Sequence, residues 1–280
     1  MSWVKRILNL TRAGHSGTLD PQVTGVLPVM LGNATKIANA LLTSGKEYVC
    51  IMRLHQKEPP QKVRDAAAEF LGTIYQRPPV RSSVKRRVRT RKIYYLDILE
   101  IDEQNVLFRV GCQAGTYIRK LVYDIGEVLG GGAHMAELRR TRTGPFKEDA
   151  TLATLYDVMD AYHFWHEEKD ERLLRQYIHP LEDGVQHLPH IIIRDSAVDA
   201  ICHGANLAAA GVLKLHDDIE SGDFVALMTL KGEMVALAVA QQNSNQILEA
   251  TSGIVADTRR VVLPAGTYPS AWRRKVTKNS

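Results

Sequence analysis

The sequence predicts an α+β fold in two parts of unequal size. Helical and strand-like patterns alternate over residues 1–185, whereas short apolar strands separated by Gly or Asp turns dominate residues 190–268. With 280 residues and 45% hydrophobic composition, the chain has enough apolar side chains for packed cores. The domain boundary is expected between Gly184 and Pro189, and a basic tail over residues 269–280 closes the chain.

The first elements alternate between helix and strand. Residues 4–10 have the spacing of an amphipathic helix, and residues 34–43 continue as a helix after the apolar run TGVLPVML. The stretch EYVCIMRL predicts a strand over residues 47–54. Apolar residues at helical spacing predict a further helix over residues 62–71.

The next elements follow a basic segment of the chain. Alternating apolar residues predict strands over residues 94–101 and 106–113. A helix is expected over residues 117–129, and the glycines at 130–132 are expected to end it rather than to bind phosphate, because they follow a helix instead of opening one. Residues 151–179 predict a polar-rich helical stretch.

The second part resembles a small β-rich domain. A short helix is expected over residues 196–202. Strands are expected over residues 191–193, 224–229, 234–240 and 261–263.

The cysteines and the hydropathy pattern predict an intracellular protein. Cys50, Cys112 and Cys202 are far apart and odd in number, so they indicate neither a disulfide framework nor a zinc site. No stretch approaches the roughly 18 apolar residues of a membrane span, and the N-terminal residues are unlike a signal peptide. The expected compartment is the cytoplasm, with no membrane partner.

Two histidine pairs have simpler explanations than metal binding. His163 and His166, and likewise His187 and His190, have the spacing of a ligand pair, but no Cys or carboxylate completes a recognised pattern. Surface or capping roles are therefore expected, and no metal site is predicted. The sequence also lacks the motifs of nucleotide hydrolysis, serine esterases and dinucleotide binding.

The positive charge of the chain is concentrated in one segment. The net charge is only +5, but residues 81–92 (RSSVKRRVRTRK) contain seven Lys or Arg and no acid. A run of this kind is typical of a phosphate-binding surface, although it is also compatible with a solvated strand face. The predicted RNA-binding residues in this segment are Arg81, Lys85, Arg86, Arg87 and Arg89.

A short acidic motif lies near the start of the chain. The stretch GHSGTLDP places Asp20 between a Gly-punctuated turn and a proline, and such an Asp is usually a turn residue or a helix cap. Further along, the tripeptide KEY supplies the phenol of Tyr48, and GTYIR supplies Tyr117 and Arg119 at the start of a helix. Leu138 follows in HMAELRRTRTG.

Together these segments resemble the TruB family of pseudouridine synthases. The resemblance runs in order through GHSGTLDPQVTGVLPVMLGNATK, KEY, GTYIRKLVYDIGEVLG and ELRRTRTGPF. The stretch YQRPPVRSSVKRRVRTRKIYYLDILEID is similar to the dyskerin branch, in its archaeal form. The resemblance implies a mixed, mainly antiparallel β-sheet catalytic domain with flanking helices and a shortened N terminus, followed by a small β-barrel PUA domain.

The resemblance also implies residue roles. Asp20 would be the catalytic aspartate, and Arg119 would pair with it and keep it ionised. Tyr48 would stack on the flipped base and is a candidate base for the proton on carbon 5 of uracil. The substrate pocket would be lined by Tyr117, Leu138 and His15. The reaction needs no cofactor, and whether the aspartate attacks the base or deprotonates the sugar is left open.

The dyskerin branch implies a ribonucleoprotein. The PUA-like segment would hold a box H/ACA guide RNA, with Gly204 and Ala205 as candidate contacts. The implied protein partners are a small zinc-ribbon-like subunit, a homologue of the glycine-arginine-rich protein, and a kink-turn-binding relative of a ribosomal protein.

Three functions are compatible with the sequence. The first is a guide-dependent enzyme that isomerises uridine to pseudouridine in rRNA and also, in some cases, in tRNA. The second is a stand-alone tRNA pseudouridine synthase. The third is a catalytically silent RNA-binding scaffold, against which the presence of Asp20, Tyr48 and Arg119 argues.

Overall fold

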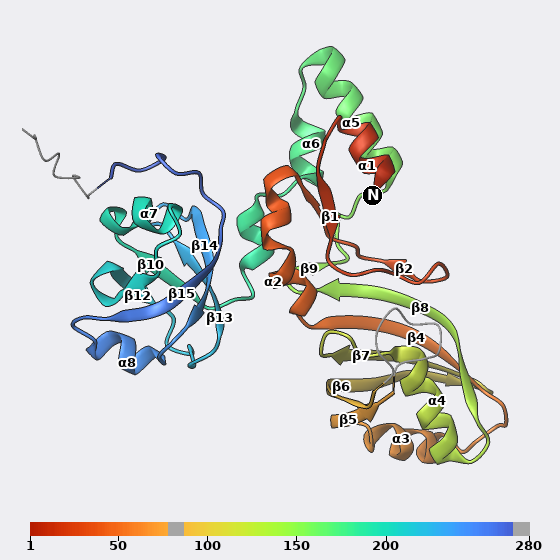
Figure 1. The fold of residues 1–280 in the computed structure, drawn as a ribbon. Coiled ribbons are helices and arrows are strands. Elements are labelled where there is room, and N and C mark those ends of the chain that lie inside the picture. The colour runs from red at the N-terminus through yellow and green to blue at the C-terminus, as the bar shows by residue number, and fades with distance from the viewer. Residues whose placement is uncertain (78–86, 271–280) are drawn as a thin grey trace, which may run out of the picture. The chain divides into compact units, whose positions relative to one another are not determined.

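The computed structural model describes residues 1–77 and 87–270, and its contacts divide the chain into two compact units (Figure 1). Unit 1 consists of Met1–Gly14, Met30–Ala40 and Leu155–Ser280, and unit 2 consists of His15–Val29 and Leu41–Thr154. The predicted domain limits stay a prediction. Residues 271–280 of the expected basic tail lie outside the described residues.

Unit 2 is built on a seven-stranded sheet with the spatial order β2, β8, β4, β7, β6 and β5, and with β9 paired to β8. The strands are β2 (Thr24–Gly25), β4 (Lys46–Leu54), β5 (Gly72–Gln76), β6 (Arg89–Asp102), β7 (Asn105–Cys112), β8 (Ala133–Thr143) and β9 (Phe146–Lys147). β2 runs parallel to β8, and the other pairs are antiparallel. The prediction of a mixed, mainly antiparallel sheet is confirmed.

Two helices form the core of unit 2 with one face of this sheet. Cys50, Met52 and Leu54 alternate along β4, and all three side chains are buried in the core. The same core cluster contains side chains of α3 (Pro60–Ala68) and α4 (Ile118–Leu129). Each fully buried large apolar side chain stabilises the fold by about 1.5–3 kcal/mol, so this layer holds α4 firmly against the sheet.

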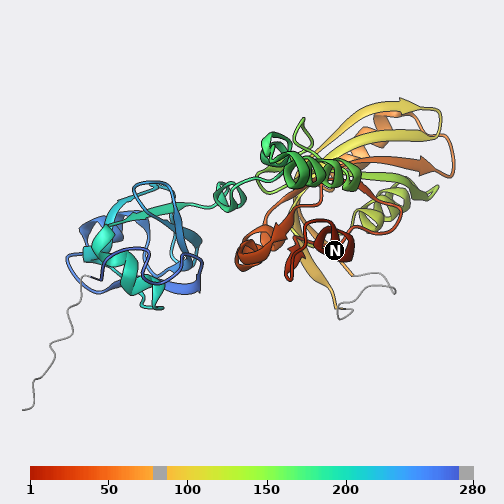
Figure 2. The same ribbon diagram turned by 90° about the horizontal axis from the view of Figure 1, so that it is seen from above.

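Unit 1 contains a six-stranded sheet that curls toward a barrel (Figure 2). Its spatial order is β11, β15, β14, β13, β10 and β12, and only β10 and β13 pair in parallel. The strands are β10 (His190–Ile193), β11 (Leu207–Ala208), β12 (Val212–Leu215), β13 (Phe224–Met228), β14 (Met234–Ala240) and β15 (Ile254–Val261). Helices α7 (Asp195–Cys202) and α8 (Ser244–Glu249) complete this body, and the predicted small β-barrel domain is confirmed.

Other elements of unit 1 come from both ends of the chain. Helix α1 (Ser2–Ile7) lies beside α5 (Leu155–Glu168), which is followed by α6 (Arg172–Tyr177). Strands β1 (Ala13–His15) and β3 (Val29–Leu31) form a two-stranded sheet. Within residues 1–77 and 87–270, no helix combines the length and the apolar composition that crossing a bilayer requires.

Some predicted elements have different bounds in the structure. The predicted helix at 34–43 is a 3-10 helix, η1 (Gly32–Ile37), followed by α2 (Ala38–Thr43). The predicted helix at 151–179 is two helices, because the chain turns at Lys169, whose φ is 59°. The predicted strand at 261–263 is wrong, since β15 ends at Val261.

Other elements escaped the sequence patterns. Strands β5, β8 and β12 and helix α8 were not expected, and β8 is the most important of them because it lies between β2 and β4. Its sequence, AHMAELRRTRT, is too rich in charged residues to show clean alternation. The expected stop after α4 is confirmed, because Gly130 has a φ of 83° that other residues rarely adopt.

Candidate active site

Asp20 and Arg119 form an ion pair that joins distant parts of unit 2. Asp20 lies in the loop between β1 and β2, and Arg119 lies in the first turn of α4. The Arg119 Nη2 donates to the Asp20 Oδ2 at 2.8 Å across 99 positions of sequence. Both side chains remain more than half exposed, at 53% and 59%, so the carboxylate is held in place but is open to a substrate.

A short turn positions Arg119. The Thr116 N–H donates to the Gln113 carbonyl at 3.2 Å, and Tyr117 then adopts the extended conformation of an N-cap before α4 begins. Gln76, which is only 2% exposed, accepts from the Tyr117 N–H at 2.9 Å and donates to the Tyr117 carbonyl at 3.1 Å. One buried amide therefore fixes the residue that starts the helix.

Tyr48 lies on β4 as a cross-strand neighbour of Arg140 on β8. Burial raises the pKa of the Tyr48 phenol, and the nearby Cys112 and Asp20 act in the same direction. The charge of Arg140 and a hydrogen bond from its side chain oppose this rise in pKa. Because its pKa lies above the ordinary value of about 10, Tyr48 carries its proton at neutral pH.

The predicted pocket residues occupy three different elements of unit 2. Tyr117 precedes Arg119, as described above, and Leu138 is paired with Cys50 in the β4–β8 ladder, close to the Tyr48 pair. His15 ends β1, and its Nδ1 accepts from the Gly17 N–H at 3.3 Å. His15 thus helps to shape the turn that leads to Asp20.

Sequence reasoning missed two buried cations beside Tyr48. Arg140 is 2% exposed; its Nη2 donates to the Gly17 carbonyl in the loop that carries Asp20, and its Nε donates to the Val26 carbonyl just after β2. Lys46 is 8% exposed, and its ammonium donates to the carbonyls of Leu41, Leu42 and Ser44 at the end of α2. Both residues stand within the quoted motifs, but the burial of their charges depends on strand pairing that the motifs do not reveal.

Three family models together match most of the chain. The family model for the TruB family pseudouridylate synthase (N terminal domain) matches residues 5–118. A model for the tRNA pseudouridylate synthase B C-terminal domain matches residues 119–186, and the PUA domain model matches residues 189–262.

This chain belongs to the TruB family. It is a pseudouridine synthase, and its curated relatives include the probable tRNA pseudouridine synthase B of Methanopyrus kandleri, 61% identical over 98% of this chain and 81% of that protein. The probable tRNA pseudouridine synthase B of Thermococcus kodakarensis is 57% identical over the same shares.

The TruB-family chain is similar in structure to solved subunits of ribonucleoproteins. A chain of a Cbf5–Nop10–Gar1 complex superposes with a TM-score of 0.93 at 56% identity, covering 96% of this chain and 82% of that chain. A chain of an H/ACA ribonucleoprotein bound to a substrate RNA containing 2′-deoxyuridine superposes with a TM-score of 0.90 at 53% identity, covering 97% of this chain and 82% of that chain.

The predicted RNA-binding residues of this TruB-family enzyme are only partly within the described structure. Arg81, Lys85 and Arg86 lie outside the described residues. Arg87 is exposed, and Arg89 is half-buried at the start of β6.

The two PUA candidates lie after α7, on the surface of unit 1. Gly204 and Ala205 are exposed, and the Ala205 carbonyl accepts from the Thr258 hydroxyl at 2.7 Å. Their backbone is therefore anchored to β15 while the surface around them remains open.

The histidine pairs of the TruB-family chain have other partners. The Nε2 atoms of His187 and His190 lie 3.1 and 3.2 Å from the carbonyl oxygens of Ala40 and Val185. His166 is paired with Glu167. Across residues 1–77 and 87–270, no group of three or more His, Cys, Asp or Glu side chains is arranged to hold a metal ion.

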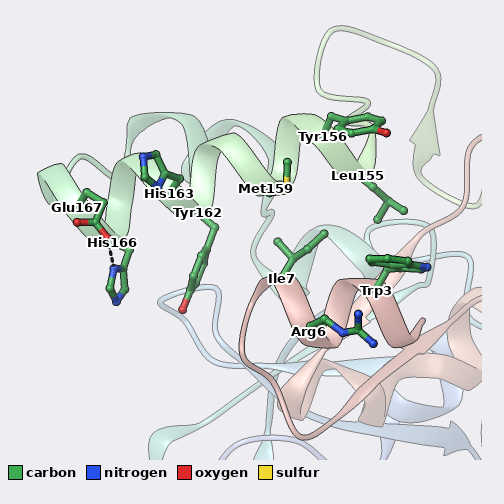
Figure 3. A pocket seen from close by; sticks show the side chains of 10 residues that line it. All are labelled: Trp3, Arg6, Ile7, Leu155, Tyr156, Met159, Tyr162, His163, His166 and Glu167. Atoms are coloured by element: carbon green, nitrogen blue, oxygen red, sulfur yellow. Dashed lines mark hydrogen bonds and ion pairs between the residues drawn. The ribbon is translucent and has the colours of Figure 1, made fainter.

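A mainly apolar pocket of about 540 Å³ lies between α1 and α5. Figure 3 shows Met159 and Leu155 of α5 pointing toward Ile7 and Trp3 of α1. His163 and His166 belong to its rim. None of the predicted catalytic or uridine-pocket residues lines it, so it is separate from the site around Asp20.

Proposed function

We propose that this TruB-family enzyme is an RNA-guided pseudouridine synthase, the catalytic subunit of a box H/ACA ribonucleoprotein that modifies rRNA and in some cases tRNA. The observation that carries the proposal is the close match over almost the whole chain to a subunit of an H/ACA ribonucleoprotein bound to substrate RNA. The match to a chain of a Cbf5–Nop10–Gar1 complex supports the same branch.

The proposed chemistry is an isomerisation without a cofactor. The bond between the ribose and N1 of uracil breaks, the base turns over, and a bond to carbon 5 forms. The proton on carbon 5 leaves and N1 gains one, so atoms and electrons balance. Asp20 is the proposed catalytic residue, acting either on the base or by deprotonating the sugar, and Arg119 keeps its carboxylate ionised and oriented.

Tyr48 is the proposed base for the proton on carbon 5. Its raised pKa means that the phenol must first lose its own proton, and the adjacent Arg140 lowers the cost of that step. The pocket residues proposed to hold the flipped uracil are Tyr117, Leu138 and His15.

The proposed partners follow from the same branch. A guide RNA would select the target by base pairing, with Gly204, Ala205 and the basic segment as RNA contacts. The proposed protein partners are the zinc-ribbon-like subunit, the homologue of the glycine-arginine-rich protein and the kink-turn-binding relative of a ribosomal protein.

The second candidate function is a stand-alone tRNA pseudouridine synthase. The observation that favours it is the description of the curated relatives, which are called probable tRNA pseudouridine synthase B. Tritium release from carbon-5-labelled uridine separates the two functions. We expect release from a target RNA only when the partners and a matched guide are present, whereas release from tRNA without a guide would support the stand-alone enzyme.

Replacing the proposed catalytic carboxylate tests the site itself. Asp20→Asn removes the charge but keeps the size, so we expect guided tritium release to fall at least 1,000-fold, roughly the loss typical of removing a nucleophile or key electrostatic group. Guide RNA affinity should stay within about twofold of the wild-type value, because the carboxylate does not hold the guide.

Asp97→Asn is a matched control for this variant. Asp97 forms a similarly exposed 2.8 Å ion pair with Arg109 in the same unit, so the same chemical change should leave the rate nearly unchanged. Full activity in Asp20→Asn, or equal losses in both variants, would contradict the assignment.

A further inference from the structure

We propose that Arg140 is a positioning residue of the active site, which clamps both ends of segment 17–26, the segment that carries Asp20, and turns its guanidinium toward Tyr48. The inference deepens the proposed function, because it rests on the roles proposed for Asp20 and Tyr48. It concerns a residue of the ELRRTRTG motif that touches the catalytic machinery rather than the substrate.

The clamp uses both the side chain and the backbone of Arg140. The Arg140 Nε donates to the Val26 carbonyl at 2.8 Å, and its Nη2 donates to the Gly17 carbonyl at 3.3 Å. The Arg140 carbonyl in turn accepts from the Val26 N–H at 2.8 Å. Gly17 and Val26 bracket Asp20 in sequence, so one residue of β8 sets the position of the whole loop.

Gly25 shows how closely the loop approaches this residue. Gly25 is paired with Arg140 in the parallel β2–β8 ladder and has a φ of 102°. A Cβ atom at this position would lie 2.1 Å from the Arg140 carbonyl oxygen. The loop is therefore packed directly on the backbone of Arg140, and movement of that strand would move Asp20.

The charge of Arg140 is buried without an acidic partner. Among the described residues, its guanidinium forms no ion pair with a carboxylate; it donates to the neutral carbonyls of Val26 and Gly17 and to the Tyr48 phenol. A buried cation that is hydrogen-bonded but not neutralised projects its positive potential onto nearby groups. If Arg140 served only the stability of the fold, an apolar side chain of similar size would stabilise it equally well or better, without the free-energy cost of burying a charge.

The positive potential of Arg140 acts on the Tyr48 phenol. The two residues are cross-strand neighbours on β4 and β8. The other charged or titratable groups that act on the Tyr48 phenol are Cys112 of β7 and Asp20 of the loop, and both favour its protonated form. Arg140 is therefore the neighbour that favours the phenolate.

Two substitutions separate the clamp from the charge. Arg140→Met removes both, whereas Arg140→Lys retains a cation but replaces the two separate donor atoms that reach Val26 and Gly17 with a single nitrogen. Single-turnover tritium release with saturating guide and partners is measured from pH 6 to pH 10, together with RNA affinity and thermal unfolding. Arg142→Met is the matched control, because Arg142 is an exposed arginine of the same motif that donates to the Gly144 carbonyl instead of the Asp20 loop.

We expect Arg140→Met to lower the rate about 100-fold while RNA affinity changes less than threefold, since a displaced catalytic group costs rate rather than binding. The alkaline rise of the rate should also move to higher pH, because the Tyr48 phenolate loses its neighbouring cation. Arg140→Lys should lose rate but keep the wild-type pH profile, and Arg142→Met should behave as wild type.

The following results would overturn the inference. A rate within threefold of wild type in Arg140→Met, or a loss that leaves the pH profile unchanged, overturns the inference. Should Arg140→Met fail to fold, Arg140→Lys carries the test, and wild-type rates in that variant overturn the clamp. An active wild type with an inactive Asp20→Asn keeps the proposed function standing even when the Arg140 inference fails, whereas a wild type inactive on every RNA overturns both.

Discussion

At the scale of single residues, the active site combines one exposed ion pair with two buried cations. The Asp20–Arg119 pair is more than half exposed, so it contributes about 1 kcal/mol or less to stability. The main effect of this ion pair is to orient the Asp20 carboxylate. Lys46 and Arg140, by contrast, are almost fully buried, and the positive charge of Arg140 helps to lower the pKa of Lys46.

Lys46 makes the stability of the fold depend on pH. Burial, followed by repulsion from Arg140, lowers the pKa of Lys46 from 10.5 to about 8. Below pH 8 the folded and unfolded chains both carry the charge, and folding bears the cost of burying it. Between pH 8 and 10.5 the folded chain releases the proton first, so stability from this group rises with pH.

We therefore expect the unfolding free energy of the wild type to rise, relative to Lys46→Met, by roughly 3 kcal/mol between pH 8 and 10.5. Urea unfolding at several pH values measures this difference. Lys57→Met is the control, because Lys57 is 66% exposed and should show no such trend. A difference between wild type and Lys46→Met that stays flat over this window would contradict the expectation.

At the scale of elements, the site depends on how the two residues of β2 pair with β8. This parallel pair is small, yet it attaches the Asp20 loop to the central sheet. On the opposite side, α4 presents Arg119, and Gln76 at the end of β5 holds the start of that helix. The loop before β2 and the start of α4 thus meet at one ion pair.

Gly25→Ala tests the close pairing of β2 and β8. The added methyl group would meet the Arg140 carbonyl, so we expect the unfolding free energy to fall by on the order of 3 kcal/mol or more, with a further loss of rate. Gly72→Ala is the matched control, since Gly72 also has a positive φ of 84° but open space where its Cβ would stand.

The control variant should lose about 1–2 kcal/mol from backbone strain alone and keep its rate. Equal effects of the two substitutions in denaturant unfolding and single-turnover assays would show that backbone strain, rather than the contact with Arg140, makes Gly25 necessary.

At the scale of the whole molecule, the proposed site residues fall in two units. The proposed catalytic residues lie within unit 2, and the candidate PUA contacts lie within unit 1. The excess positive charge is concentrated in residues 81–92, of which 87–92 are described; residues 87–88 precede β6, and residues 89–92 begin it. If these cations contact the phosphates of an RNA, counterions are released on binding, so RNA affinity should depend on salt.

Changing Arg86, Arg87 and Arg89 together to Ala tests the basic segment. We expect weaker guide RNA binding and a shallower slope of log affinity against log salt, by about 0.7–0.9 for each lost phosphate contact. Arg172 and Arg175 of α6 are a useful comparison, because they are highly exposed but already paired with Asp170 and Glu171, which precede the helix. Unchanged binding after the triple substitution would identify the basic run as a solvated face.

Some features of the fold escaped the sequence for a physical reason. The helix at residues 117–129 and its glycine stop were predictable, because periodicity and a positive φ are local properties. β8 was not predictable, because polar and apolar residues do not alternate along its sequence. Which of its side chains are buried depends on the neighbouring elements that cover each face of the strand. Arg140 is buried there while Arg139, beside it, is exposed.

The sequence by itself determined the TruB-family motifs, the α+β fold class and the residues that form the Asp20–Arg119 pair. These properties depend on short stretches of sequence, which can be recognised without knowing how the strands pair. Only the tertiary structure decided that Arg140 holds the Asp20 loop and faces Tyr48, and that Lys46 caps α2. Such contacts depend on the register between strands about 90 residues apart, and a local pattern does not specify which side chains that register brings together.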